Sequence, residues 1–279
     1  HLFSSAASDV YKRQQSHRLV RLYPFASRRT RGNAAVAVEI IGDDYDELIT
    51  FLESWWTSKL LPLKGLISES DMSDRQQYPS DPGMVWFSDP LSADFYWECV
   101  SREVTISETP EATKSWGGNG IIGATAAVSW PALDYTYEAI CWRTKESVSM
   151  GKTRLVDLKR LAEIDSKSET FMSRDLRSNS ILISPRGNCP VLFGLRAKTY
   201  DSAKINSQYL TESSMTETID GMIVFQTNQA TDDHLLEDST AFVEDITIKR
   251  RGTVAVLCRC GTVLLSLIHI SEPTRLTSI

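Results

Sequence analysis

Cysteine and histidine are scarce in this sequence, and their scatter excludes several kinds of site. The 279 residues include 5 cysteines and 4 histidines. No two cysteines form a CxxC pair and their number is odd, so neither a zinc ribbon nor a disulfide framework is visible. We therefore predict no metal ligands, and the scattered thiols fit a protein of the reducing cytoplasm.

Short motifs of common enzyme families are missing as well. The chain has no Walker loop, no GxSxG elbow and no protein-kinase signature. No apolar run is long enough to cross a bilayer, so we expect no membrane partner. The absence of these motifs therefore leaves the enzyme class open.

Basic residues are fewer than acidic residues in this sequence. The formal net charge is -6, which is the wrong overall sign for nonspecific nucleic-acid binding. Any RNA contact must therefore use local basic patches, although each patch could equally be an ordinary solvated face. The two candidate patches are His17, Arg18, Arg21, Arg28, Arg29 and Arg31, and then Lys249, Arg250 and Arg251.

Both ends read as translated sequencing adapters. Residues 4–14 read SSAASDVYKRQ and residues 265–275 read LSLIHISEPTR. The codons GAT GTG TAT AAG AGA CAG encode residues 9–14, and their reverse complement encodes residues 265–270. We therefore expect 1–14 and 265–279 to be adapter-derived and the rest to be a truncated fragment. The alternative is that LSLIHI is a genuine buried strand.

The order of apolar patterns predicts an α+β fold. Strands are expected at 34–41, 84–87, 135–142, 181–184, 191–195 and 222–226, and a strand-rich unit from Val243. Helices are expected after the N-cap candidates Asp43 and Asp44, at 91–102, from the Gly-rich stretch 117–123 through Val128, and at 200–210. If the charged segment 155–164 is also a helix, the second half has the element order of a ferredoxin-like sandwich.

The Gly-rich stretch satisfies the pattern GxGxxG at residues 118–123. A dinucleotide site needs a strand directly before this pattern, and residues 111–116 are polar and not strand-like. We therefore favour a loop whose glycines let a helix start close to a sheet.

Two polar motifs lie beside expected strands. Thr30, Arg31, Gly32 and Asn33 precede one strand and offer donors for a phosphate, or form an ordinary turn. The segment 227–234 follows another strand and reads TNQATDDH, which is typical either of a site or of a polar turn.

Five blocks in order resemble one family, the archaeal agmatinylcytidine synthetases of isoleucine tRNA. The blocks are 18–24 with 30–33; 81–83; 120–124 with 126–127, 135–138 and Arg143; 189–196; and 225–232 with 234–235. The resemblance implies a partial kinase-like catalytic domain at 15–114, a ferredoxin-like domain at 115–236 and the start of an OB-fold at 243–264. It places the domain boundary near 113–118.

The resemblance also implies a reaction. ATP with Mg²⁺ activates C2 of the wobble cytidine of isoleucine tRNA with a CAU anticodon by phosphorylation, and agmatine then displaces the phosphate. Candidate nucleotide or phosphate contacts are Thr30, Arg31, Gly32 and Asn33. Candidate substrate contacts are Arg196, Asn228, Gln229, Thr231, Asp232 and His234.

The sequence departs from the family pattern in ways that bear on activity. The Asp-rich opening that serves the family's ATP site is not found before Gln15 in the given sequence, and we expect the zinc ribbon and most of the OB-fold to be missing from this chain. The position expected to be Arg is Asn119, and Ala197 replaces an expected Gly. We therefore expect this chain to be inactive although its parent is an enzyme. The alternatives are a non-catalytic RNA-binding protein with the same domains and, less favoured, a nucleotide-dependent metabolic enzyme.

Overall fold

The chain forms two compact units. The computed structural model describes residues 13–24, 26–28, 33–41, 45–67, 78–144, 154–175, 178–185, 190–231, 233, 242–248, 254–260 and 263–269. The first unit comprises His1–Thr136 with Phe225–His234, and the second comprises Tyr137–Val224 with Leu235–Ile279. The two units are described separately below.

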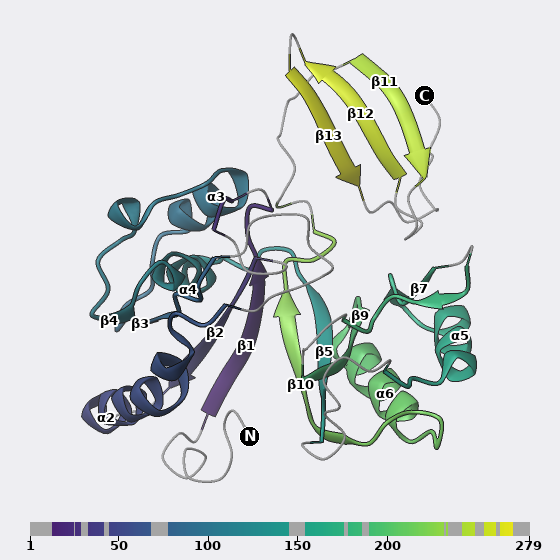
Figure 1. Ribbon diagram of the computed structural model, residues 1–279, viewed down its shortest axis with the longest axis horizontal. Helices are drawn as coiled ribbons and strands as arrows, with labels where there is room; N and C mark the ends of the chain where they lie inside the picture. Colours follow the sequence, from purple (N-terminus) through teal and green to yellow (C-terminus); the bar gives the residue numbers. More distant parts are fainter. Residues whose placement is uncertain are drawn as a thin grey trace. The chain divides into compact units, whose positions relative to one another are not determined.

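The first unit holds the two strands at one edge of a six-stranded sheet, and one helix packs against both of them (Figure 1). Its elements are β1 (Arg13–Arg21), β2 (Ala34–Ile41), α2 (Tyr45–Trp55), the π-helical turn η1 (Trp56–Leu60), η2 (Leu61–Leu63), β3 (Gly83–Trp86), α3 (Asp94–Ser101), η3 (Ile106–Glu108), β4 (Lys114–Gly117) and α4 (Gly120–Ser129). β1 and β2 pair antiparallel, with Arg21 opposite Ala34. The last residues of β10 (Ile219–Thr227) pair in parallel with β1, so that Leu19 lies opposite Thr227.

Small residues let α4 pack closely within the first unit. Its sequence GIIGATAAVS places Ala126 and Ala127 fully inside the core, where they contact no water. α4 packs against β1, β2, β3 and α3. The core they form includes Val20, Phe95 and Trp130, and burying a side chain of this size contributes about 2 kcal/mol.

The elements that follow supply the remaining strands of the same six-stranded sheet, together with two helices. They are β5 (Thr136–Arg143), α5 (Leu158–Lys167), β6 (Thr170–Phe171), β7 (Arg174–Asp175), β8 (Ser180–Ile181), β9 (Val191–Ala197), α6 (Tyr200–Thr211) and β10. The strand order is β10-β5-β9-β6, with β5 and β6 both antiparallel to β9. α6 packs against β9 and against α5.

Side-chain caps fix where the two helices begin. The Asp157 carboxylate accepts from the backbone of Lys159 at 2.9 Å, and the Thr199 hydroxyl accepts from the backbone of Ser202 at 3.2 Å. Such caps satisfy N–H groups that have no partner within the helix. The amphipathic helices then bury Leu161 and Leu210 against the sheet.

A separate antiparallel sheet ends the described chain. It has the order β11-β12-β13, with bounds β11 (Phe242–Ile248), β12 (Val254–Cys260) and β13 (Val263–His269). β13 includes most of the LSLIHI segment. An apolar run pairs in this way whatever its origin, so the adapter interpretation stays a prediction.

The predicted α+β class is confirmed, and the sheet is mixed because only the β1–β10 pairing is parallel among those described for it. The expected strand at 34–41 is confirmed residue for residue as β2. The helix predicted at 200–210 is confirmed as α6 and the charged segment as α5. No helix in the described part of the chain has the length and apolar character required of a membrane span.

One prediction is wrong. Residues 111–116 were expected to lack a strand, but β4 covers Lys114–Gly117. Alternation of Lys114, Ser115 and Trp116 lets β4 pair with β3, so that Trp116 lies opposite Met84. This two-stranded ribbon is antiparallel and differs from the parallel βαβ unit of a dinucleotide site.

Candidate functional site

The loop after β10 carries most of the predicted substrate contacts. It begins at Asn228, and its backbone turns sharply at Ala230, whose φ is 59°. The Thr136 hydroxyl donates to the Gln229 carbonyl at 2.6 Å, and the Thr231 hydroxyl donates to the Asn228 carbonyl at 2.9 Å. These bonds hold the loop in one shape.

Asn228 connects the loop to β1. Its Oδ1 accepts from the Arg21 backbone N–H at 2.7 Å, and its Nδ2 donates to the Arg21 carbonyl at 2.8 Å. The amide thus extends the β1–β10 pairing by one step through a side chain. Asn228 is fully buried, and its amide holds the start of the loop against β1.

A second anchor lies at the far end of the loop. The Tyr96 hydroxyl accepts from Nδ2 of Asn228 at 2.8 Å and donates to Oδ2 of Asp233. Nε1 of Trp130 donates to the same Oδ2 at 3.3 Å. Burial, reinforced by the bond to Asp233, raises the pKa of Tyr96, so its hydroxyl keeps its proton.

Several predicted residues fall outside the described chain or serve local structure. Thr30, Arg31, Gly32, Asp232 and His234 lie outside the described residues. Asn33 has a positive φ of 38°, and its Nδ2 donates to the Tyr23 carbonyl at 2.7 Å, which closes the turn before β2.

Arg196 lies on β9 in the second unit. Its Nε is 3.4 Å from Oε2 of the buried Glu138, which is its partner across the β5–β9 ladder. Gly194 leaves room for this carboxylate, because a Cβ there would lie 2.6 Å from Oε1 of Glu138. Nη1 of Arg196 also donates to Sδ of Met172 at 3.7 Å. Two of the guanidinium nitrogens therefore already contact side chains of the protein.

The Gly-rich stretch is occupied by a carboxylate of the protein itself. Oδ2 of Asp81 accepts from the backbone N–H and from Nδ2 of Asn119, both at 2.7 Å. The backbone bond from Asn119 is the main reason that the pKa of Asp81 lies below its usual range. A carboxylate at this helix start takes the place that a phosphate would need.

Close approach explains the glycines. A Cβ on Gly120 would lie 2.2 Å from the backbone N of Gly83, and one on Gly118 would lie 2.1 Å from Oδ1 of Asp81. The glycines therefore let α4 start against β3, as expected from the sequence.

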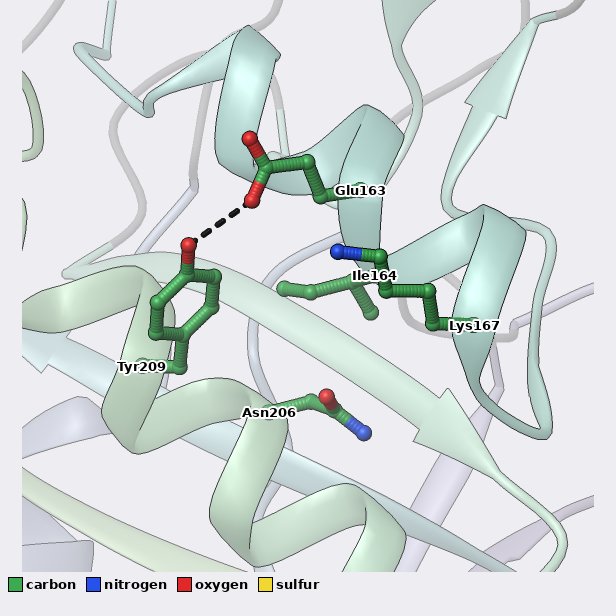
Figure 2. A pocket seen from close by; sticks show the side chains of 5 residues that line it. All are labelled: Glu163, Ile164, Lys167, Asn206 and Tyr209. Atoms are coloured by element: carbon green, nitrogen blue, oxygen red, sulfur yellow. Dashed lines mark hydrogen bonds between the residues drawn. The ribbon is translucent and has the colours of Figure 1, made fainter.

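A small hollow lies between α5 and α6. Figure 2 shows Glu163, Ile164, Lys167, Asn206 and Tyr209 around it, with Tyr209 donating to Glu163 at 2.8 Å. Its volume of about 160 Å³ is below the roughly 300 Å³ at which ligand pockets begin. None of the predicted site residues lines it, and we assign it no ligand.

Sequence reasoning missed Tyr96, Trp130 and Asp233. Tyr96 lies in the helix expected at 91–102, where the pattern does not distinguish it from an ordinary core side chain, and Trp130 directly follows the end of α4. Asp233 adjoins the predicted Asp232, so the acidic doublet was the available signal.

Two family models match the chain in succession. The TiaS TCKD domain matches residues 12–120, and the TiaS FLD domain matches residues 118–234. Together they account for both described units up to the loop after β10.

Curated relatives from archaea match most of this chain but only about half of their own length. The TiaS protein of Ignisphaera aggregans, a 2-agmatinylcytidine synthetase of isoleucine tRNA, is 30% identical over 255 residues, which cover 85% of this chain and 53% of that protein. The protein of the same name from Pyrococcus horikoshii is 31% identical over 232 residues, covering 78% and 51%. The chain thus spans about half the length of the curated relatives it matches.

Solved structures share the fold. A tRNA fluorescent labeling enzyme has a TM-score of 0.68 at 24% identity, and a complex of TiaS with isoleucine tRNA and ATP has a TM-score of 0.67 at 24% identity. Each match covers 90% of this chain and 62% of the other. At this identity, the likeness establishes the fold alone.

Proposed function

The chain belongs to the TiaS family, and we propose on that premise that it serves the ATP-dependent attachment of agmatine to isoleucine tRNA. The observation that carries the proposal is the succession of two TiaS domain models over residues 12–234. The tRNA would carry a CAU anticodon, and the reaction would take place in the cytoplasm.

In the proposed reaction, ATP phosphorylates the oxygen on C2 of the wobble cytidine. The primary amine of agmatine then attacks C2, so that a C–N bond forms, the C–O bond to phosphate breaks and the nitrogen gives up a proton. Phosphoryl transfer of this kind depends on positioning and charge neutralisation.

The proposed residue roles follow the two polar motifs. Thr30, Arg31, Gly32 and Asn33 would contact nucleotide phosphates. Arg196, Gln229, Thr231, Asp232 and His234 would contact substrate, with Asn228 positioning the loop that carries four of them. The described residues contain no group of three or more His, Cys, Asp or Glu side chains that could hold a metal ion, so we assign magnesium no ligands among them.

The finer domain assignment is part of the proposal. Residues 115–236 would form a ferredoxin-like domain, which is supported by the element order β5-α5-β6-β9-α6-β10 and the sheet order β10-β5-β9-β6. Residues 15–114 would be kinase-like, and the antiparallel β11-β12-β13 sheet would begin an OB-fold.

Transfer of radiolabelled agmatine to an isoleucine tRNA transcript tests the function. With the full-length parent protein we expect ATP-dependent incorporation that disappears when the wobble cytidine is replaced by uridine, and with this chain alone we expect none. Salt-dependent tRNA binding with neither incorporation nor agmatine binding would contradict the proposal and favour a non-catalytic RNA-binding protein.

A further inference from the structure

The strand β2 is an open edge of the six-stranded sheet. It lies at one end of the strand order, and among the described residues β1 is its only strand partner. The strand at the opposite edge, β6, has 2 residues, whereas β2 has 8. A very short edge strand offers little backbone for pairing, but a long one presents a row of unpaired N–H and C=O groups. β2 is therefore the edge of this sheet that can add another strand.

The sequence of β2 lacks the features that protect an edge strand from pairing. It reads AAVAVEII, with no lysine and no proline, and its single charge is Glu39. Oε2 of Glu39 already lies 3.5 Å from Nη2 of Arg18 in the same chain. Val36 and Ile41 are 52% and 50% exposed. An exposed apolar edge with so little charge favours pairing with another chain.

The hydrogen bonds at the end of the β1–β2 ladder show which residues of β2 face outward. The Leu22 N–H donates to the Asn33 carbonyl at 2.9 Å, one step beyond the pair formed by Arg21 and Ala34. In an antiparallel ladder, residues that bond to the partner strand alternate with residues whose N–H and C=O point away from it. The residues of β2 that turn these groups away from β1 are therefore Ala34, Val36, Val38 and Ile40.

We propose that β2 pairs antiparallel with β2 of a second copy of this chain, about a two-fold axis at Ala37. This register uses all the outward residues, because Val36 lies opposite Val38 of the second copy and Ala34 lies opposite its Ile40. The same strand serves both copies, so the contact closes as a dimer. The paired side chains are apolar and share one face of the joined sheet, where cross-strand contacts stabilise the pairing. The proposal is independent of the reaction assigned above.

The register also keeps the acidic side chains apart. Glu39 of one copy lies opposite Ala35 of the other, so no like charges face each other across the contact. A register that set Glu39 opposite its own counterpart would oppose two carboxylates and would leave most of the outward groups unpaired. Charge and backbone pairing therefore favour the same register.

Sedimentation velocity of the full chain over a wide range of concentrations tests the proposal. We expect a reversible equilibrium between a monomer of 31.3 kDa and its dimer. Val36→Pro removes an outward N–H from each copy and leaves the bonds to β1 in place, so it should raise the Kd of the dimer about tenfold or more. Val36→Thr keeps the N–H and the β-branched shape, and its Kd should stay within about twofold of the wild-type value.

A second variant and a second measurement keep the test decisive if Val36→Pro does not fold. Val36→Lys places a charge at an exposed position of the edge and should weaken the dimer, whereas Ile205→Lys, at a 60% exposed position of α6, should not. In the wild type, amide exchange at Val36 and Val38 should slow as the concentration rises, while exchange at Ala37, which bonds to β1, should stay constant. A wild type that remains monomeric would refute the proposal. A dimer that persists in both Val36→Pro and Val36→Lys would also refute it, because the contact would then lie elsewhere on the chain.

Discussion

At the scale of single residues, the Asp81 side chain comes from the loop before β3 and caps the start of α4, which is distant in sequence. Its carboxylate accepts from the backbone N–H of Asn119, the N-cap residue of α4, as the N3 glutamate of a capping box would. We predict that Asp81→Ala lowers the free energy of unfolding by about 1 kcal/mol, as measured by urea titration at pH 7. An equal stability of wild type and variant would contradict this role.

The pH dependence of this cap follows from its pKa. Contacts in the folded protein hold the pKa of Asp81 below its usual value, so its stabilisation is complete above that usual value. It is lost as the pH falls through the lower, folded value, and the difference between wild type and Asp81→Ala should narrow in acid. Gly118→Ala is a useful partner, because its Cβ would displace the Asp81 carboxylate. The double variant should therefore be less destabilised than the sum of the two single changes.

At the scale of elements, the buried ion pair between Arg143 and Glu217 joins the end of β5 to the segment before β10. Nε of Arg143 lies 2.8 Å from Oε2 of Glu217, and their side chains are 2% and 12% exposed. Oε1 of Glu217 also accepts from the Leu155 backbone at 2.7 Å, ahead of α5. Burial would raise the pKa of Glu217, but the bonds from Arg143 and Leu155 outweigh it and lower that pKa. Three elements thus meet at one carboxylate.

Removing either partner of the Arg143–Glu217 ion pair should destabilise the folded protein. We predict that Glu217→Gln or Arg143→Met lowers the free energy of unfolding by about 3 kcal/mol, because each leaves a buried group without its charged partner. The double variant Arg143→Met with Glu217→Met should recover part of the loss. The exposed Arg102, which pairs with Glu98 and Glu108, is the control, and Arg102→Ala should lower the free energy of unfolding far less than Arg143→Met does. Equal effects of Arg143→Met and Arg102→Ala would show that the pair does not hold these elements.

At the scale of the whole molecule, the sequence predicted elements well and their partners poorly. β2 and α6 could be identified because strand and helix periodicities are local properties. β4 was missed because a short polar strand is stabilised by its partner β3, which local periodicity does not reveal. Trp130 and Tyr96 were not identified as parts of the site for the same reason. Their polar atoms meet Asp233, which is more than a hundred residues further along the chain.

The two units can be followed separately in solution because each holds a buried cysteine. Cys99 lies in the first unit and Cys141 in the second, and burial raises the pKa of each thiol to about 12. Because the thiolate is the reactive form, we predict that iodoacetamide labels neither residue in the native protein at pH 8, as read by peptide mass spectrometry. β10 contributes Val224 to one unit and Phe225 to the other, so in a urea series both should become reactive at the same concentration. Labelling of one cysteine at clearly lower urea would mean that its unit unfolds alone and that the shared strand does not couple them.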